Sequence, residues 1–499
     1  MAKFIFITGG VVSSLGKGIN GSSIGMLLKN RGYKVFMQKF DPYLNVTPRN
    51  MSPLQHGEVF VTDDGAETDL DLGHYERFID VDLSKHSSVT TGKVYLKVIE
   101  QERNNEFGGR TIQVIPHITN MIKEYVYNAA KYSGADFVIT EIGGTVGDIE
   151  GLPFLEAIRQ VRIEQGFNNT FFVHNTLVPY LESSKELKTK PTQHSVKELR
   201  SIGINPDMII LRSSKKVSNE ERDKIALFCD VKKESVIEAI DVKSIYEIPL
   251  SFAKQHADEI VLNHCGLEVK PIDLTYLNEI RKKVSEAKQK LYVPFIAPFV
   301  ALRDAYISIS EAFKHAGYAL GYDVEFKYID PLTTAKEEIV KTIEEFGGYV
   351  IGPDFESKAK EIEVMVLKEF KNSHLPFLTI GEGTMALFEA YENRKPNTVS
   401  HWRIGGRDLD VDPKTHIYKI YENEKVRERF YTNLNVEDQE APKGMKNCVW
   451  YLKEPVAYEK ERGFGYGFYY NPALISRPLR PRKLFIEFLK EVARIQLKA

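Results

Sequence analysis

The chain has 499 residues, of which 42% are hydrophobic and 27% are charged, and its formal net charge is −2. A single hydrophobic core rarely supports a chain of this length, so we expect two or three domains. The balanced charge gives no support for nucleic-acid binding or for a basic membrane-binding surface, and no apolar run reaches the roughly eighteen residues of a membrane-spanning helix. The three cysteines are scattered, which argues against a disulfide scaffold and predicts a cytoplasmic location.

A glycine-rich loop follows the first apolar segment of the chain. Residues 4–7 have the composition of a strand and lead, through Gly9, Gly10, Gly16, Lys17 and Gly18, into a helix predicted over 22–31. Glycines allow the backbone N–H groups to face a polyphosphate, and a lysine adds positive charge. The match to a Walker A loop is imperfect, because five residues separate the second glycine from the third and glycine follows the lysine. A plain glycine-rich turn is the alternative, but the flanking elements favour nucleotide binding.

The next segments predict a parallel sheet. A strand over 34–40 ends beside Lys39 and Asp41, and further strands are expected over 135–142, 170–173 and 208–211. A strand–loop–helix–strand order favours parallel strands with right-handed crossovers, whose ligands bind at the carboxyl ends of the strands. Taken alone, Lys39 is more simply interpreted as a solvated charge at a strand end.

Three acidic residues are candidate metal ligands. Asp69 and Asp71 alternate with apolar residues, so on an extended segment they would share one face, although an ordinary acidic turn is equally consistent with the spacing. Glu141 ends a strand that is predicted to be buried on both faces, which is a Walker-B-like arrangement. Carboxylates of this kind suit Mg²⁺, a cation that takes oxygen ligands.

Residues 188–195 combine two lysines, two threonines, a glutamine and a proline. We expect a loop that grips an anionic ligand through these side chains. An isolated segment of this composition is more often a plain surface loop, so the interpretation depends on its neighbours.

Several segments together resemble CTP synthases, in the order that the family has. They are Gly9–Gly18 and residues 52–61, 65–78, 113–119, 141–150 and 188–199, within residues 1 to about 262. The resemblance implies a ligase that uses ATP to phosphorylate the 4-oxygen of the uracil ring of UTP. Ammonia then attacks the same carbon, and phosphate leaves to give CTP.

The resemblance also implies roles for individual residues. Lys17 and Lys39 are expected to act on the phosphoryl group in transfer, and Asp71 and Glu141 to hold Mg²⁺. The residues expected to bind ATP are Ser14, Leu15, Gly16, Lys17, Gly18, Ile19, Asp71, Ile240, Asp241 and Val242. Those expected to bind UTP, or CTP as a feedback inhibitor, are Ser13, Asp148, Ile149, Glu150, Lys188, Thr189, Lys190, Pro191, Thr192, Gln193 and Lys224. His56 and Val59 are expected along the passage of ammonia.

The second half resembles the glutamine amidotransferase domain of the same family, but the residues of its catalytic triad are missing. Such a domain cuts glutamine with a cysteine on a strand-to-helix elbow, helped by a histidine and a glutamate. Here Gly381 stands at the elbow, and Asn471 and Ala473 replace the histidine and the glutamate. Glycine still permits a strained elbow backbone. Arg429 matches a position near the glutamine site, and we interpret it as solvent-facing.

The predicted fold class is α/β with three parts. Residues 1–265 form a P-loop-type parallel-sheet synthetase domain, 266–290 a connecting helix, and 291–499 a class I glutamine-amidotransferase-like domain. By resemblance we expect a homotetramer, and filaments or a separate glutaminase that delivers ammonia remain open. The alternative function is a nucleotide-binding structural or regulatory pseudoenzyme of the same family.

Overall fold

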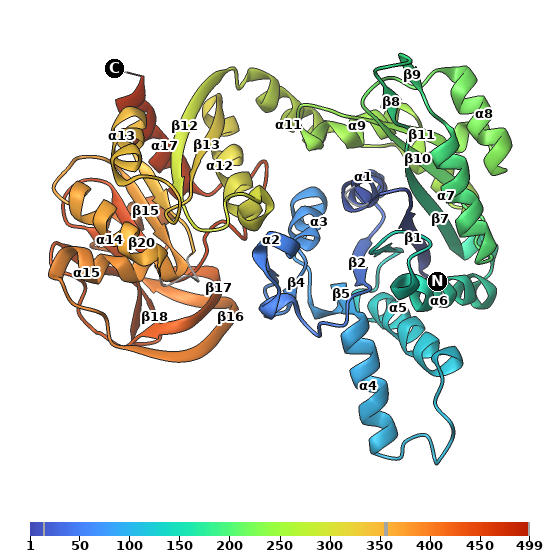
Figure 1. Cartoon of the computed structure of the whole chain (residues 1–499), viewed down its shortest axis with the longest axis horizontal. Helices are drawn as coiled ribbons and strands as arrows, with labels where there is room; N and C mark the ends of the chain where they lie inside the picture. The colour runs from blue at the N-terminus through green and yellow to red at the C-terminus, as the bar shows by residue number, and fades with distance from the viewer. Residues whose placement is uncertain (13–14, 354–357, 498–499) are drawn as a thin grey trace. The chain divides into compact units, whose positions relative to one another are not determined.

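The computed structural model of the chain describes residues 1–12, 15–353 and 358–497 (Figure 1). They form two compact units. Unit 1 comprises Met1–Pro48 and His74–Arg281, and unit 2 comprises Arg49–Gly73 and Lys282–Ala499. Segment 49–73 is therefore grouped with the second half of the chain, which the sequence patterns do not predict. Among the described residues, no helix is both long and apolar enough to cross a membrane.

Unit 1 is built on a parallel sheet with the strand order β11-β10-β7-β1-β6-β2-β5. Every pairing in it is parallel, as the sequence predicts. Its strands are β1 (Lys3–Gly9), β2 (Val35–Asp41), β5 (Ser88–Thr90), β6 (Phe137–Ile142), β7 (Thr170–Leu177), β10 (Met208–Ser213) and β11 (Val236–Ile240). The central strands are buried along nearly their whole length because helices cover both faces of a parallel sheet.

The helices of unit 1 connect these strands. They are α1 (Lys17–Asn30), α4 (Thr91–Arg103), α5 (Thr119–Ser133), α6 (Leu152–Gln165), α7 (Lys190–Ser201), α8 (Asn219–Cys229), α9 (Ile248–Lys254) and α10 (Ala257–His264). Helix α3 (Asp71–Ile79) enters the unit from segment 49–73, and a short hairpin of β8 (Tyr180–Leu181) and β9 (Glu186–Leu187) precedes α7.

Helix α1 begins earlier than predicted. The sequence pattern places its start near Ser22, whereas the structure begins the helix at Lys17. The reason is close packing: a Cβ at Gly21 would lie 3.1 Å from Ile7, and one at Gly25 would lie 3.1 Å from Ile79. Small residues on the buried face therefore bring the helix close to its neighbours, and they hide the apolar periodicity on which the prediction relied.

Unit 2 contains a mixed sheet with the order β13-β12-β14-β15-β20-β19-β18-β16-β17. Pairings from β13 to β20 are parallel and the remainder are antiparallel. Its strands are β12 (Gln289–Ile296), β13 (Tyr322–Ile329), β14 (Tyr349–Ile351), β15 (Phe377–Ile380), β16 (Thr398–Val411), β17 (Lys425–Val436), β18 (Met445–Tyr451), β19 (Glu454–Lys460) and β20 (Gly465–Phe468). This α/β architecture is of the predicted class.

The helices of unit 2 flank this sheet. They are α12 (Ile307–Leu320), α13 (Lys336–Phe346), α14 (Ala359–Phe370), α15 (Ala386–Glu392), α16 (His416–Tyr421) and α17 (Lys483–Gln496). Segment 49–73 adds α2 (Pro53–His56) and a hairpin of β3 (Phe60–Val61) and β4 (Glu67–Thr68). The helix predicted between the two halves of the chain is α11 (Thr275–Glu286).

Candidate functional site

The glycine-rich loop leaves strand β1 and enters helix α1, as predicted. Gly16 has a φ of +80° and precedes Lys17, the first residue of the helix. A Cβ at Gly9 would lie 2.6 Å from Cδ of Lys17, and a Cβ at Gly10 would lie 1.8 Å from Oγ of Ser195. A side chain at position 9 or 10 would therefore displace Lys17 or Ser195, whereas the backbone conformation favours glycine at position 16. Ser13 and Ser14 lie outside the described residues.

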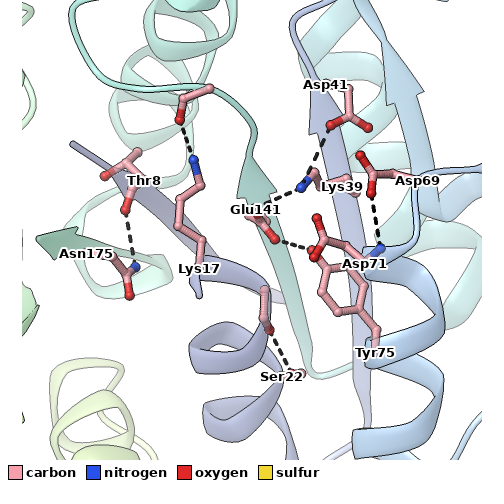
Figure 2. Close-up of polar contacts among 12 residues, drawn as sticks. Thr8, Lys17, Ser22, Lys39, Asp41, Asp69, Asp71, Tyr75, Glu141 and Asn175 are labelled. Carbon is pink, nitrogen blue, oxygen red and sulfur yellow. Dashed lines mark hydrogen bonds and ion pairs between the residues drawn. The ribbon is translucent and has the colours of Figure 1, made fainter. Parts of the chain in front are cut away.

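Lys17 reaches from helix α1 to the turn after strand β6. Its Nζ donates a hydrogen bond to the carbonyl oxygen of Gly144 (Figure 2). In the same turn, the N–H of Val146 donates to the carbonyl oxygen of Gly9 at 2.8 Å. A phosphate oxygen is a stronger acceptor for an ammonium group than a peptide carbonyl. An anionic ligand at the loop would therefore compete with the Gly144 carbonyl oxygen for Lys17.

A buried charged cluster stands at the carboxyl ends of β2 and β6. Nζ of Lys39 lies 3.0 Å from Oε1 of Glu141 and 3.8 Å from Oδ1 of Asp41, and the Tyr75 hydroxyl donates to Oε2 of Glu141 (Figure 2). Lys39 is 5% exposed and Glu141 is 2% exposed. The parallel register places these two residues side by side. The interpretation of Lys39 as a solvated charge is therefore wrong, because it is buried and paired.

Asp69 and Asp71 were expected to share one face of an extended segment, but they do not. Strand β4 ends at Thr68 and helix α3 begins at Asp71. Oδ1 of Asp69 accepts a hydrogen bond from the N–H of Asp71 at 3.2 Å (Figure 2). Aspartate readily bonds to a backbone N–H at the start of a helix, and this local contact competes with an extended conformation. Asp71 stands one helical turn before Tyr75.

The segment predicted as a ligand-gripping loop, 188–195, is mostly helical. Helix α7 begins at Lys190 and has Pro191 in its first turn. Proline favours this position because its φ is already helical and its missing N–H is not needed there. Thr192 is fully buried, and its hydroxyl lies 3.0 Å from that of Thr176 in β7. Thr192 therefore faces the protein interior within unit 1.

The other predicted nucleotide-binding residues differ in exposure. The exposed residues are Asp148, Ile149, Glu150, Lys190, Lys224, Asp241 and Val242. The partly buried residues are Gly16, Lys17, Ile19, Lys188, Pro191, Gln193 and Ile240, and the buried ones, besides Thr192, are Leu15, Gly18 and Thr189. Gln193 donates from its side-chain amide to the Thr189 hydroxyl at 3.3 Å, and Lys188 forms an ion pair with Glu186.

Sequence reasoning missed a polar group at the carboxyl end of strand β7. His174 is fully buried, with Nδ1 2.9 Å from Oγ1 of Thr8 and Nε2 2.7 Å from Oγ of Ser195. Burial, and then the charge of Lys17, lower the pKa of His174 to about 3, so the imidazole is neutral. The prediction ended this strand at residue 173, but polar residues directly after a buried strand were the signal that could have found the group.

In unit 2, Gly381 directly follows strand β15 and has a φ of +65°. It lines a cavity of about 440 Å³ together with Tyr306, Tyr470 and Asn471. The residues that the structure describes around this cavity include neither a cysteine nor a histidine. Oδ1 of Asn471 accepts a hydrogen bond from the N–H of Ala473 at 3.0 Å. Gly381 thus has the left-handed backbone conformation that glycine permits, as was expected at this position. Asp354 and Phe355 lie outside the described residues.

Segment 49–73 contributes to the same cavity. Val59 lines it, and the neighbouring Glu58 accepts hydrogen bonds from the N–H and the hydroxyl of Ser308, at 3.0 and 2.6 Å, at the start of α12. The His56 side chain is buried, with Nε2 3.6 Å from Oδ2 of Asp69. A carboxylate at a helix N-terminus is favourable, so Glu58 anchors this segment to the rest of unit 2.

Arg429 is not solvent-facing, so that interpretation is wrong. It is 1% exposed, and its Nη1 donates to the carbonyl oxygen of Val61 at 3.1 Å. The neighbouring Arg427 pairs with Asp63 of the same segment at 2.7 Å. Strand β17 therefore holds segment 49–73 through two arginines, and sequence spacing carried no sign of this pairing.

Comparison with known proteins shows two matched families. The family described as "CTP synthase N-terminus" matches residues 3–267, and "Glutamine amidotransferase class-I" matches residues 301–491. A CTP synthase of Lactiplantibacillus plantarum is 44% identical, with 98% of each chain covered. A CTP synthase of Bacillus cytotoxicus has the same identity and coverage. This chain belongs to the CTP synthase family.

Two solved structures match part of the chain. The glutaminase domain of a Trypanosoma brucei CTPS with bound acivicin covers 41% of this chain and 94% of its own, at 16% identity and a TM-score of 0.37. A glutamine amidotransferase of Thermotoga maritima has a TM-score of 0.29 at 14% identity. The family assignment therefore stands on the sequence matches.

The two matched families divide the candidate residues. The first contains every residue predicted to bind nucleotide or metal, and also His56 and Val59. The second contains Gly381, Asn471 and Ala473. Segment 49–73 belongs to the first match by sequence but to unit 2 by packing. In this member of the CTP synthase family, sequence domains and compact units thus have different boundaries.

Proposed function

We propose that this protein makes CTP from UTP, ATP and ammonia. The γ-phosphoryl group of ATP passes to the 4-oxygen of the uracil ring, giving ADP and 4-phosphorylated UTP. Ammonia then forms a bond to carbon 4, the carbon–oxygen bond breaks, and phosphate leaves with its bonding electrons. Phosphorylation is needed because the unmodified oxygen is a poor leaving group.

The observation that carries this proposal is the buried cluster of Lys39, Glu141 and Tyr75 beside the glycine-rich loop. Phosphoryl transfer depends mainly on positioning and charge neutralisation. Lys17 would bind a phosphate of ATP in place of the Gly144 carbonyl, and Lys39 would neutralise charge on the phosphoryl group in transfer. A buried lysine that a carboxylate and a strand hold in place needs little reorganisation for this role.

Asp71 and Glu141 would hold Mg²⁺, which would neutralise charge on the ATP phosphates. Their donor atoms are all oxygen, which this cation prefers. Among the described residues, no three or more histidine, cysteine, aspartate or glutamate side chains converge. One or two carboxylates suffice for Mg²⁺ when phosphates and water supply the other ligands. The exposed segment Asp148–Glu150, together with residues 188–193 and Lys224, would bind UTP or inhibitory CTP.

We infer that the nitrogen comes from free ammonia. Glycine, asparagine and alanine at 381, 471 and 473 supply neither a nucleophile nor a general base. No described cysteine lines the cavity beside Gly381, and the three cysteines are free and buried elsewhere. Val59 lies on the wall of this cavity, and ammonia would pass this residue and His56.

The test is CTP formation by the pure full-length chain with UTP, ATP and Mg²⁺. We expect turnover with ammonium chloride, rising with pH because neutral ammonia is the nucleophile, and none with glutamine. Lys17→Ala is the control and should abolish CTP formation while leaving thermal stability nearly unchanged. Robust glutamine-dependent turnover would overturn the assignment of free ammonia as the nitrogen source.

Two further outcomes distinguish the alternatives. Nucleotide binding without CTP formation from ammonia would favour a regulatory pseudoenzyme. Turnover that appears only after a second protein from the source cell is added would favour a separate glutaminase. We also propose a homotetramer with the uridine pocket shared between subunits. Light scattering with and without UTP and ATP would test the oligomeric state, and electron microscopy would show filaments.

A further inference from the structure

Strand β7 joins the glycine-rich loop to helix α7 through alternate side chains. His174 contacts Ser195, and Thr176, two residues further on, contacts Thr192, at 2.7 and 3.0 Å. Residues two apart on a strand share a face, and residues three apart on a helix are neighbours. The strand and the helix are thus connected by two parallel side-chain bridges. All four side chains are buried, so water does not compete for these bonds.

The first bridge continues to the loop. Nδ1 of His174 lies 2.9 Å from the Thr8 hydroxyl, at the end of β1. Oγ of Ser195 packs against Gly10 so closely that a Cβ there would lie 1.8 Å away. The N–H of Gly10 donates to the carbonyl oxygen of Asn175 at 3.1 Å. His174 and its neighbour therefore contact both the start of the loop and the helix.

The residue between the two bridges faces the other side of the sheet. Asn175 accepts a hydrogen bond from the Asn20 side chain in α1 at 2.7 Å. It also donates to the carbonyl oxygen of Thr8 at 3.2 Å (Figure 2). His174, Asn175 and Thr176 of strand β7 thus contact both α1 and α7. A displacement of α7 would be transmitted to Gly10 through Ser195.

We propose that His174 is a positioning residue that couples the ATP site at the loop to the UTP site at the start of α7. This inference rests on the proposed function, because residues 188–193 are assigned to UTP there. Ligands at two sites are coupled when both favour one arrangement of a shared element. The shared element here is the chain Gly10–Ser195–His174–Thr8.

A neutral imidazole suits this position because it donates from one nitrogen and accepts at the other. The Thr8 hydroxyl can donate either to the carbonyl oxygen of Val173, 3.2 Å away, or to Nδ1 of His174. In the first case Ser195 donates to Nε2, and in the second it accepts from Nε2–H. The group can therefore change hydrogen-bond direction without charge, while its partners stay in contact.

The test uses two variants that each keep half of the bridge. In His174→Asn the amide replaces Nδ1 and retains the contact with Thr8, whereas in His174→Gln it reaches toward Ser195. Thr176→Val removes one buried hydrogen bond from the second bridge and is the matched control. The measurement is the Kd of a non-hydrolysable ATP analogue with and without saturating UTP, by calorimetry on the full-length chain, together with the KM of each nucleotide.

In the wild type we expect UTP to tighten binding of the analogue by at least about fivefold, the lower end of typical coupling. His174→Asn should reduce this factor to near one and raise the KM of UTP, whereas His174→Gln and Thr176→Val should retain most of it. The proposal is overturned if the wild type shows no coupling, or if all three variants lose thermal stability equally while coupling is unchanged. A wild type that binds both nucleotides with coupling but makes no CTP would contradict the proposed function alone.

Discussion

Substitution of Lys39 or Glu141 tests whether the charges of these two residues stabilise each other. At 3.0 Å and an effective dielectric constant of about 20, their attraction is about 5 kcal/mol. Removing one partner of a buried pair typically costs about 3–5 kcal/mol, because the other charge stays buried. We expect Lys39→Met to lower the free energy of unfolding of unit 1 by this amount. Glu141→Gln should cost less, because Lys39 keeps Asp41 at 3.8 Å.

The double variant Lys39→Met/Glu141→Gln provides the decisive comparison. It leaves no unpaired charge in the pair, so its cost should be at least about 2 kcal/mol smaller than the sum of the two single costs. Lys39→Met and the double variant should lose CTP formation because the phosphoryl group would no longer meet a lysine at this position. Glu141→Gln should lose it because Mg²⁺ would lose a proposed carboxylate ligand.

Amide hydrogen exchange in strands β2 and β6 measures the stability of unit 1 directly. Both tryptophans, Trp402 and Trp450, lie in unit 2, so denaturant unfolding followed by tryptophan fluorescence serves as an internal control. The free energy of unfolding from tryptophan fluorescence should be nearly unchanged in every variant. Additive costs in the double variant would refute the reasoning, because they would show that Lys39 and Glu141 do not stabilise each other.

Three further predictions concern other parts of the chain. Gly10→Ala should weaken ATP binding in calorimetry, because its Cβ would lie 1.8 Å from Oγ of Ser195, so that either the Ser195 side chain or the loop would have to move. As the pH falls from 6.5 to 5.0, the free energy of unfolding of unit 1, measured by hydrogen exchange, should fall by about 2 kcal/mol. The reason is that His174 has a folded-state pKa of about 3, so it protonates first in the unfolded chain. His174→Gln should remove this pH dependence. Gly381→Cys should give no glutaminase activity in an ammonia-release assay, because Asn471 cannot act as the base, and it should cost about 1–2 kcal/mol at a φ of +65°.

The sequence alone was sufficient to predict features that depend on consecutive residues. The glycine loop with Lys17, the parallel order of the strands and the acidic end of β6 at Glu141 were all predicted and are present. The absence of the expected residues at 381, 471 and 473 is likewise visible without coordinates. These features depend on residue type and spacing, which the chain order alone specifies.

Predictions failed where a local contact competed with the expected pattern. Asp69 bonds to the start of α3 rather than extending a strand, and Pro191 lies in the first turn of helix α7 rather than in a loop. Glycines at the buried face of α1 removed the periodicity that would have marked its first turn. In each case the pattern was compatible with two local structures, and packing against neighbouring elements selected one.

Only the tertiary structure decided which distant residues share a site. The sequence alone determined the family and the α/β class, since these follow from composition and contiguous motifs, and it predicts a phosphate ligand for the loop. The pairing of Lys39 with Glu141, the burial of Arg429 against Val61 and the bridge from Thr8 through His174 to Ser195 join residues far apart in the chain. Such contacts arise from strand register and helix placement, which depend on the whole core and leave no trace in local spacing.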